Sequence, residues 1–255
     1  MLAIKNATVY DGLGQVLKDQ TIFIKDGKFV EIGTSVDIPA DCEVIDIEGK
    51  IITPGFIDVH SHLGVSEEGI GSVGVDTNEA GNPVTPEVRA IDGLDPTEPG
   101  FQDCRNEGIT TVQVMPGSGN VIGGEMVVLK TVGHIVDDMV IRNPSGMKAA
   151  LGENPKRFHG SKGKMPTTRM GVVALLRQKL MEAQDYMNHP NKKKRDLGLE
   201  NLAKVLRKEI PLRIHAHRDY DIVTALRIKE EFDIDITIEH CTEGHRIVDY
   251  LAKHN

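Results

Sequence analysis

From Gly55 onward, apolar segments of strand length alternate with helical segments, and this alternation constrains the fold most strongly. The apolar segments predict strands at residues 56–60, 110–115, 139–142, 147–151, 212–217 and 234–240. The amphipathic segments predict helices at residues 98–106, 168–187, 197–208, 222–231 and 246–252. Such alternation is typical of βα units around a parallel sheet. The pattern therefore predicts an α/β fold for residues 55–255.

The first 54 residues follow a different pattern, in which short strands are joined by tight turns. Strands are predicted at residues 3–10, 21–25, 29–32, 43–47 and 51–53. Asp26-Gly27 stands between the second and third of these, and Asp-Gly between alternating apolar runs is a strong hairpin signal. Residues 1–54 are therefore predicted to form a small β-sandwich-like domain that lacks its C-terminal strands, and residues 55–255 a separate domain.

The length of the second domain limits how much of a barrel it can encode. A complete eight-stranded βα barrel takes about 250 residues, whereas 201 residues follow residue 54, and long loops near 64–96 and 152–167 use part of them. We expect a barrel truncated after about six strands, in a chain that is incomplete at its C-terminus. Because open sheet edges invite pairing with other chains, a homo-oligomer or association with a completing polypeptide is expected.

Composition argues against several classes of partner. The net charge of −8 is unfavourable for binding nucleic acid, and the one basic run, residues 192–195, is interpreted as a solvated face. The N-terminus lacks the apolar stretch of a secretory signal, and no segment approaches the roughly 20 apolar residues of a membrane-spanning helix. Three cysteines without Cys-x-x-Cys spacing do not indicate a disulfide framework. A cytoplasmic protein with no membrane partner is expected.

Five histidines stand at the predicted ends of three strands, and they are the strongest functional signal. His60 and His62 end the first strand after Gly55, His215 and His217 end the fifth, and His240 ends the sixth. Residues two apart on a strand project to the same side, so such pairs can bind one ion. Imidazole is a common zinc ligand. The alternative is that these are satisfied core or rim residues, and for His217 the two interpretations are balanced.

The residues Thr53-Pro54-Gly55-Phe56-Ile57-Asp58-Val59-His60-Ser61-His62, Ile214-His215-Ala216-His217 and Ile238-Glu239-His240 carry a family resemblance. With the small β-unit before them, the chain resembles the amidohydrolase superfamily, in the branch that is similar to imidazolonepropionase and metal-dependent Xaa-Pro dipeptidases. The resemblance implies a (β/α)8 TIM-like barrel with one or two zinc ions. It also implies that His60 and His62 bind the buried metal, and that His215 and His240 complete the site or hold a second ion.

The same resemblance suggests roles for two further positions and leaves one role unfilled. Lys148 matches the lysine that is carboxylated to bridge two metals, with an ordinary paired or snorkelling lysine as the alternative and Glu153 in reserve. The superfamily's catalytic residue, an aspartate at the end of the eighth strand, has no match, so the catalytic residue is unknown. Arg89, His217 and Glu153 are candidate substrate contacts, although a structural salt bridge is the favoured interpretation of Arg89.

The expected function follows from this ligand set. A bound divalent ion lowers the pKa of its water to about 7 and polarises a carbonyl group. We expect an amidohydrolase that breaks a carbon–nitrogen bond, in a dipeptide, a cyclic amide or a non-peptide amide, of a small polar metabolite. The alternative is an inactive truncated pseudoenzyme or a partner-dependent subunit. The glycine-rich segment 117–124 is interpreted as a rim loop near the metal, because its spacing does not fit a phosphate-binding loop.

Overall fold

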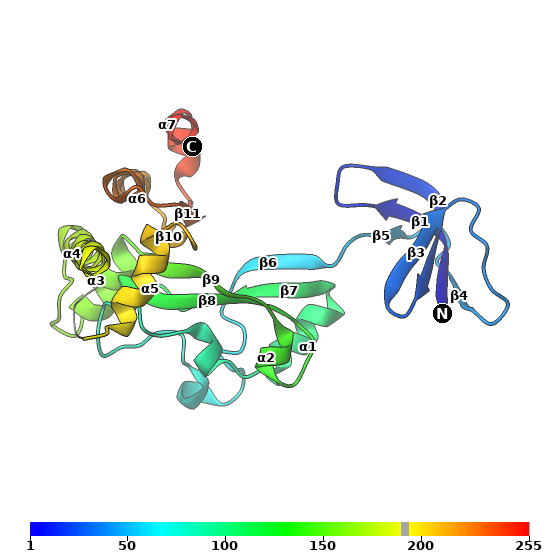
Figure 1. Cartoon of the computed structure of the whole chain (residues 1–255), viewed down its shortest axis with the longest axis horizontal. Coiled ribbons are helices and arrows are strands. Elements are labelled where there is room, and N and C mark those ends of the chain that lie inside the picture. Colours follow the sequence, from blue (N-terminus) through cyan, green and yellow to red (C-terminus); the bar gives the residue numbers. More distant parts are fainter. Residues whose placement is uncertain (190–193, 255) are drawn as a thin grey trace. The chain divides into compact units, whose positions relative to one another are not determined.

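The computed structural model describes residues 1–189 and 194–254, and the chain divides into two compact units, Met1–Phe56 and Ile57–Asn255 (Figure 1). Residues 192 and 193 of the basic run lie outside the described residues. Within the described part, no helix combines the length and apolar character needed to cross a membrane.

The first unit is a five-stranded sheet of β1 (Leu2–Tyr10), β2 (Val16–Lys25), β3 (Lys28–Gly33), β4 (Glu43–Asp46) and β5 (Ile51–Ile52). The strand order is β3-β2-β1-β4, and β5 also pairs with β1. Asp26 and Gly27 have φ of 52° and 72° and connect the antiparallel strands β2 and β3, so the predicted hairpin is confirmed. Ala7, Val9 and Ile22 form its buried core.

The second unit is built on a six-stranded sheet with the order β11-β10-β9-β8-β7-β6 (Figure 1). Its strands are β6 (Phe56–Ser61), β7 (Ile109–Val114), β8 (Ile122–Lys130), β9 (Val140–Ala150), β10 (Leu212–Ala216) and β11 (Ile236–His240). β9, β10 and β11 are parallel, whereas β8 is antiparallel to both β7 and β9. The α/β prediction is confirmed, but the sheet is mixed.

Two strand predictions were wrong: β9 was predicted as two separate strands, and β8 was not predicted. Residues 139–142 and 147–151 were predicted as two strands but form the single strand β9, and the predicted rim loop at residues 117–124 already enters β8 at Ile122. β8 escaped prediction because Gly123 and Gly124 open it and interrupt the β-branched pattern that marks strands. No crossover helix separates β7, β8 and β9 beyond the four-residue α2 (Val136–Met139), so these strands pair as antiparallel neighbours.

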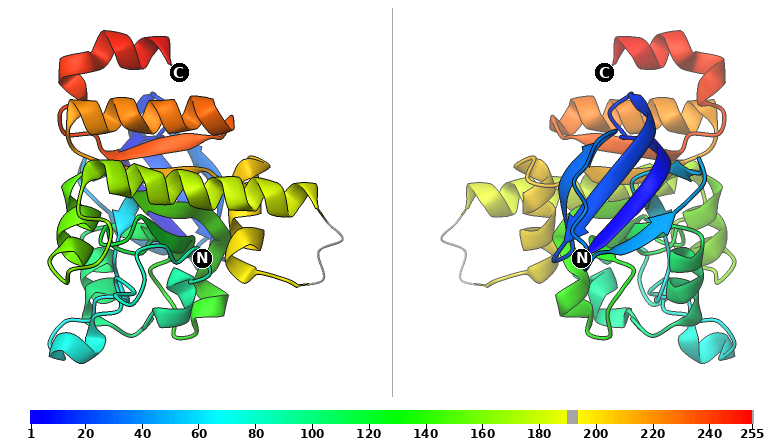
Figure 2. Two further views of the ribbon diagram at one scale, coloured as in Figure 1. Left: turned by 90° about the vertical axis from the view of Figure 1, so that its left-hand side faces the viewer. Right: turned by 90° about the vertical axis from the view of Figure 1, so that its right-hand side faces the viewer.

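Helices surround this sheet: α1 (Pro99–Asn106), α3 (Glu153–Gly160), α4 (Arg169–Asn188), α5 (Leu197–Leu206), α6 (Asp219–Phe232) and α7 (Val248–Lys253). The loops predicted at 64–96 and 152–167 are not free of helix. The first contains the 3₁₀ turns η1 (Gly71–Gly74) and η2 (Ala90–Gly93), the second contains α3, and a third turn, η3 (Gly244–Ile247), precedes α7. Helices α4 and α6 run alongside one another, joined by Arg177–Glu231 and Arg169–Asp221 ion pairs (Figure 2).

Side-chain alternation gives the two faces of the parallel strands opposite character. Met147, Ala149, Leu212 and Ile214 belong to the apolar core that packs against α4, α5 and α6. Alternate residues on the same strands face the other side, and the register pairs Arg213 with both Lys148 and Thr237, and His215 with both Ala150 and Glu239. The polar face of these strands therefore carries Lys148, Arg213, His215 and Glu239. The candidate site lies on this face.

Candidate metal centre

All five strand-end histidines line one cavity of about 680 Å³ in the second unit. His60 lies in β6 and His62 just beyond it, His215 lies in β10 with His217 just beyond it, and His240 ends β11. The remaining lining residues come from loops after β6 and β7 and from α3 and the turn after it: Thr77, Asn78, Gly117, Ser118, Gly119, Asn154, Arg157, Phe158, Ser161 and Lys162.

The imidazole rings lie close to one another. The ring centroid of His240 is 4.6 Å from those of His60 and His215, and 4.8 Å from that of His217. One ring nitrogen from each of His215, His217 and His240 lies within 4.8 Å of the others. The tightest group therefore includes His217, for which the sequence left two interpretations open.

The backbone at the end of β11 adopts an unusual conformation. His240 and the next residue, Cys241, have φ of 67° and 48°. Such left-handed conformations are uncommon outside glycine and cost of order 1–3 kcal/mol each. The amide of Cys241 donates to the carbonyl of Ala216 over 3.1 Å, which ties this turn to the end of β10. The His240 ring is thus presented from a turn that β10 holds in place.

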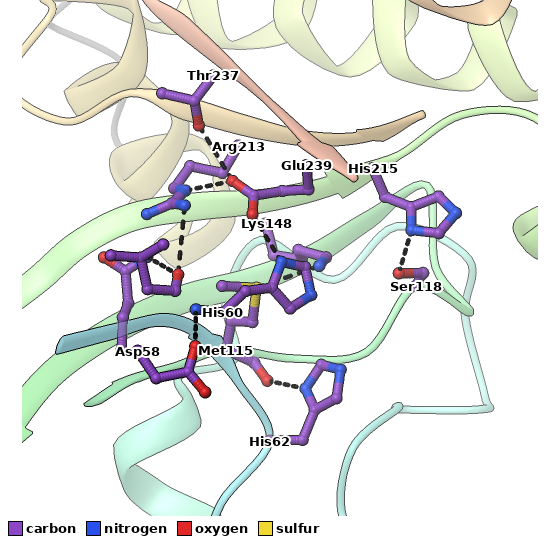
Figure 3. Close-up of polar contacts among 12 residues, drawn as sticks. Asp58, His60, His62, Met115, Ser118, Lys148, Arg213, His215, Thr237 and Glu239 are labelled. Atoms are coloured by element: carbon purple, nitrogen blue, oxygen red, sulfur yellow. Dashed lines mark hydrogen bonds and ion pairs between the residues drawn. The ribbon is translucent and has the colours of Figure 1, made fainter. Parts of the chain in front are cut away.

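Four of the histidines have their Nδ1 atoms occupied by protein groups. His60 Nδ1 is 2.6 Å from Glu239 Oε2, and His62 Nδ1 is 2.7 Å from the carbonyl oxygen of Met115 (Figure 3). His215 Nδ1 is 2.9 Å from Ser118 Oγ, and His217 Nδ1 is 2.8 Å from Thr242 Oγ1. A carboxylate and a carbonyl only accept hydrogen bonds, so His60 and His62 carry the proton on Nδ1. Their Nε2 lone pairs are left free, as a zinc ligand requires.

Three charged side chains, those of Glu239, Arg213 and Lys148, lie on the polar face beside these histidines. Glu239 is buried and accepts from Arg213 Nε over 2.6 Å in addition to its contact with His60. Lys148 is fully buried, and its Nζ lies 3.2 Å from Met115 Sδ (Figure 3). No described carboxylate forms an ion pair with Lys148. The ammonium is therefore buried without a directly paired anion.

Burial sets the protonation of the site. Burial, together with the smaller effects of the neighbouring His217 and His240, lowers the pKa of His215 to about 3. Burial likewise lowers the pKa of Lys148 to about 8, although the charge of Glu239 acts in the opposite direction. Burial alone would raise the pKa of Glu239, but hydrogen bonds from His60 and Arg213 outweigh it and hold that pKa at about 2. At neutral pH His215 is neutral and Glu239 is charged.

Helix α3 forms one wall of the cavity. Asn154, Arg157, Phe158 and Ser161 line it at the i, i+3, i+4, i+7 spacing of one helix face. Pro155 and His159, on the opposite face, are buried. His159 Nε2 donates to Asn120 Oδ1 over 2.7 Å, and Asn120 Nδ2 donates to the carbonyl of Glu79 over 2.9 Å. These contacts connect α3 to the two loops that complete the wall.

Two of the predicted substrate contacts lie outside this cavity. Arg89 makes a two-bond ion pair with Asp92, at 2.8 and 2.6 Å, and lines a separate, smaller cavity. Glu153 pairs with Arg169 over 2.8 Å and is not among the lining residues. Arg89 therefore forms a structural salt bridge, which is the interpretation that the sequence favoured for it.

The sequence interpretation missed several residues of the site. Glu239 was read only as part of the His240 motif, although its position one residue before a strand-end histidine could have marked it. Asn154 and Arg157 were missed because the sequence predicts a loop at residues 152–167, and Ser118 because a rim position has no distinctive pattern. The four-residue spacing within Glu-Asn-Pro-Lys-Arg-Phe-His-Gly was the available signal for α3.

Comparison with known proteins gives consistent matches, although no family model matches the chain. The chain is 40% identical to an amidohydrolase from Thermotoga maritima MSB8 whose crystal structure is known. It aligns with a TM-score of 0.93 over 99% of this chain and 68% of that one. It is 31% identical to amidohydrolase tasK of Hapsidospora irregularis over 94% of this chain and 27% of that protein. It is also 30% identical to an imidazolonepropionase of Legionella pneumophila, over 61% of this chain and 43% of that protein. The chain thus spans less than half the length of the two curated relatives.

Proposed function

The chain belongs to the amidohydrolase superfamily, and from this premise we propose that it is a metal-dependent hydrolase of a carbon–nitrogen bond in a small polar metabolite. The observation that carries the proposal is the convergence of five histidines on one cavity, with the Nε2 atoms of His60 and His62 left free. Imidazole donors of this kind suit zinc, and one or two zinc ions are proposed.

The proposed ligands are His60, His62, His215 and His240, with His217 as a further donor. The nitrogens of His215, His217 and His240 within 4.8 Å of one another support this set. Lys148 is proposed as a ligand after carboxylation, because burial brings its pKa to about 8 and so makes the neutral amine accessible near neutral pH. That neutral form is the one that can react with carbon dioxide.

When bound, zinc supplies a water of lowered pKa and polarises the carbonyl group that is attacked. The chain's own residues fix the site. Glu239 and the Met115 carbonyl orient His60 and His62, and Ser118 and Thr242 orient His215 and His217. Holding ligand rings in one tautomer and orientation is the usual function of such partners in metal sites. Asn154, whose amide lies 3.1 Å from His215 Nε2, is proposed to contact the substrate.

One observation favours a second candidate function. None of the described residues that line the cavity is an aspartate or a glutamate. Proton transfer to a leaving nitrogen needs a positioned acid, which contributes typically 10² to 10⁴ in rate. A chain that binds metal through these histidines without turning over substrate, as a pseudoenzyme or as a partner-dependent subunit, is therefore the competing proposal.

A hydrolysis assay separates the two candidates. The zinc-loaded full chain is tested on dipeptides, N-acetyl amino acids and cyclic amides, with chelated protein in parallel. Metal-dependent hydrolysis is expected, and His215→Ala should lose about 10²-fold or more, the scale of removing one essential catalytic element. Arg89→Gln, which alters a cation outside the cavity, should keep full activity. Zinc binding without turnover of any of these amides would support the pseudoenzyme instead.

A further inference from the structure

The helix α3 and the turn after it contribute two cations to the histidine cavity. Arg157 lies on the lining face of α3, and Lys162 follows two residues after the helix ends. Lys162 Nζ lies 4.2 Å from the centre of the Phe158 ring, a cation–π contact that keeps it at the wall. Among the described residues, no carboxylate forms an ion pair with either cation, whereas Arg169 and Arg177, further along the same segment, are both paired.

The electrostatics of the cavity are one-sided. Its lining holds five histidines, an arginine and a lysine, together with neutral amides and hydroxyls, and no acidic side chain among the described residues. Glu239, the nearest carboxylate on the polar face, is committed to His60 and Arg213. In a cavity with walls of low dielectric, charges of one sign concentrate ligands of the opposite sign. Bound metal would add to this positive potential.

The wall that carries these cations is held in a defined position. His159 anchors the buried face of α3 through Asn120. On the lining side, a Cβ at Gly119 would lie 2.9 Å from Phe158 Cδ1 and 2.7 Å from Asn78 Oδ1, so glycine at 119 allows these side chains to close on the loop. Asn78 Oδ1 also accepts from the Gly119 amide over 2.7 Å. Arg157 therefore projects from a braced helix beside the proposed metal ligands.

We propose that Arg157, assisted by Lys162, binds a carboxylate group of the substrate, so that the preferred substrates are amides bearing a free carboxylate, such as dipeptides or N-acyl amino acids. This inference rests on the proposed function. The planar guanidinium matches a carboxylate through two parallel hydrogen bonds. The carboxylate contact was expected of Arg89, and Arg157 is placed to make it.

Matched probes test the subsite without requiring turnover. The affinities of the full zinc-supplemented chain for N-acetyl-L-alanine and N-acetyl-L-alaninamide are measured by ligand-observed NMR titration. The carboxylate probe should bind about tenfold or more tightly than the amide. Arg157→Gln should reduce this preference to less than about twofold. Lys156→Gln, which removes the adjacent exposed cation outside the lining, should leave the preference intact, and circular dichroism checks that both variants fold.

Each other outcome overturns the inference. Equal or undetectable binding of the two probes, or an equal loss in Arg157→Gln and Lys156→Gln, would remove the carboxylate subsite. Stronger competition by inorganic phosphate than by acetate would assign the cations to a phosphate. The two proposals fail separately: carboxylate preference without hydrolysis leaves the subsite standing, and hydrolysis without carboxylate preference leaves only the hydrolase.

Discussion

Glu239 is not among the residues that line the histidine cavity, but it contacts His60, which is. Glu239 is buried, carries its charge at neutral pH, and bridges His60 and Arg213 at 2.6 Å on each side. Removing one partner of a buried charged hydrogen bond leaves the other charge poorly compensated. The orientation of His60 and the position of Arg213 therefore depend on this one carboxylate.

Replacing the carboxylate by an amide tests that dependence. Glu239→Gln should weaken zinc binding by roughly 10–100-fold, the usual effect of losing a ligand-orienting partner. Glu153→Gln is the matched control, because Glu153 is a partly exposed carboxylate outside the cavity. Competition with a chromophoric chelator measures both affinities. An unchanged affinity in Glu239→Gln, or the same loss in the control, would exclude the orienting role.

His159, which anchors the cavity helix α3, makes the stability of the folded chain depend on pH. It is fully buried, and its Nδ1 has no hydrogen-bond partner. Burial lowers its pKa below the ordinary value of 6.5, with a smaller contribution from nearby lysines. Below pH 6.5 the unfolded chain therefore binds more protons at this position than the folded chain does. The free energy of unfolding accordingly falls as the pH drops, and this part of the stability is retained above pH 6.5.

Urea unfolding at pH 7.5 and 5.5 isolates the contribution of His159. His159→Gln lacks the titrating group, so its unfolding free energy should fall by less than that of the wild-type chain between these pH values. The two falls in unfolding free energy should differ by at most about 1.4 kcal/mol, because pH 5.5 is one unit below the ordinary histidine pKa. Other buried histidines titrate in both proteins and cancel. Identical pH dependence in the two would contradict the assignment.

At the scale of elements, the sequence prediction missed the helix α3, which lines the cavity, and the strand β8, which belongs to the sheet that carries the histidines. The strands that carry histidines, such as β10 and β11, were predictable because apolar runs and terminal histidines mark them. The strand β8 was not predictable, because it begins with glycines that allow close packing against a neighbouring strand. A Cβ at Gly123 would lie 3.3 Å from Lys148 Cγ. The partner segment of β8, which includes Val84 and Arg89, lies far away in sequence, so only tertiary structure reveals the fit.

Gly124 packs closely against the backbone of Val88, which leaves no room for a side chain at this position. Its φ is +126°, and a Cβ there would lie 2.5 Å from the carbonyl oxygen of Val88. Gly124→Ala should lower the unfolding free energy by about 2 kcal/mol or more. Gly163→Ala also has positive φ, +69°, but meets no atom within 4 Å, so it should cost only about 1 kcal/mol. Equal losses in urea unfolding would show that close packing against Val88 does not matter.

At the scale of the whole molecule, the α/β fold was predictable from the sequence, whereas the order and directions of the strands in the sheet were not. The observed units meet after Phe56, and the predicted domains 1–54 and 55–255 remain a proposal. Strand-end histidines were predictable because period-two alternation and strand ends are local properties. The antiparallel insertion of β8 was not predictable, because it depends on which distant segments pair. The place of the α3 cations in the cavity likewise depends on contacts between segments that are distant in the sequence.

The measurement that tests the central claim most directly is the metal content of the full chain after zinc loading and gel filtration, by elemental analysis. The wild-type chain is predicted to retain one or two zinc ions per chain, and the double variant His215→Ala/His240→Ala to fall well below one. Arg89→Gln/Glu153→Gln, altered outside the cavity, should match the wild type. Equal zinc in the histidine variant and the wild type would contradict the metal centre and the function proposed for it.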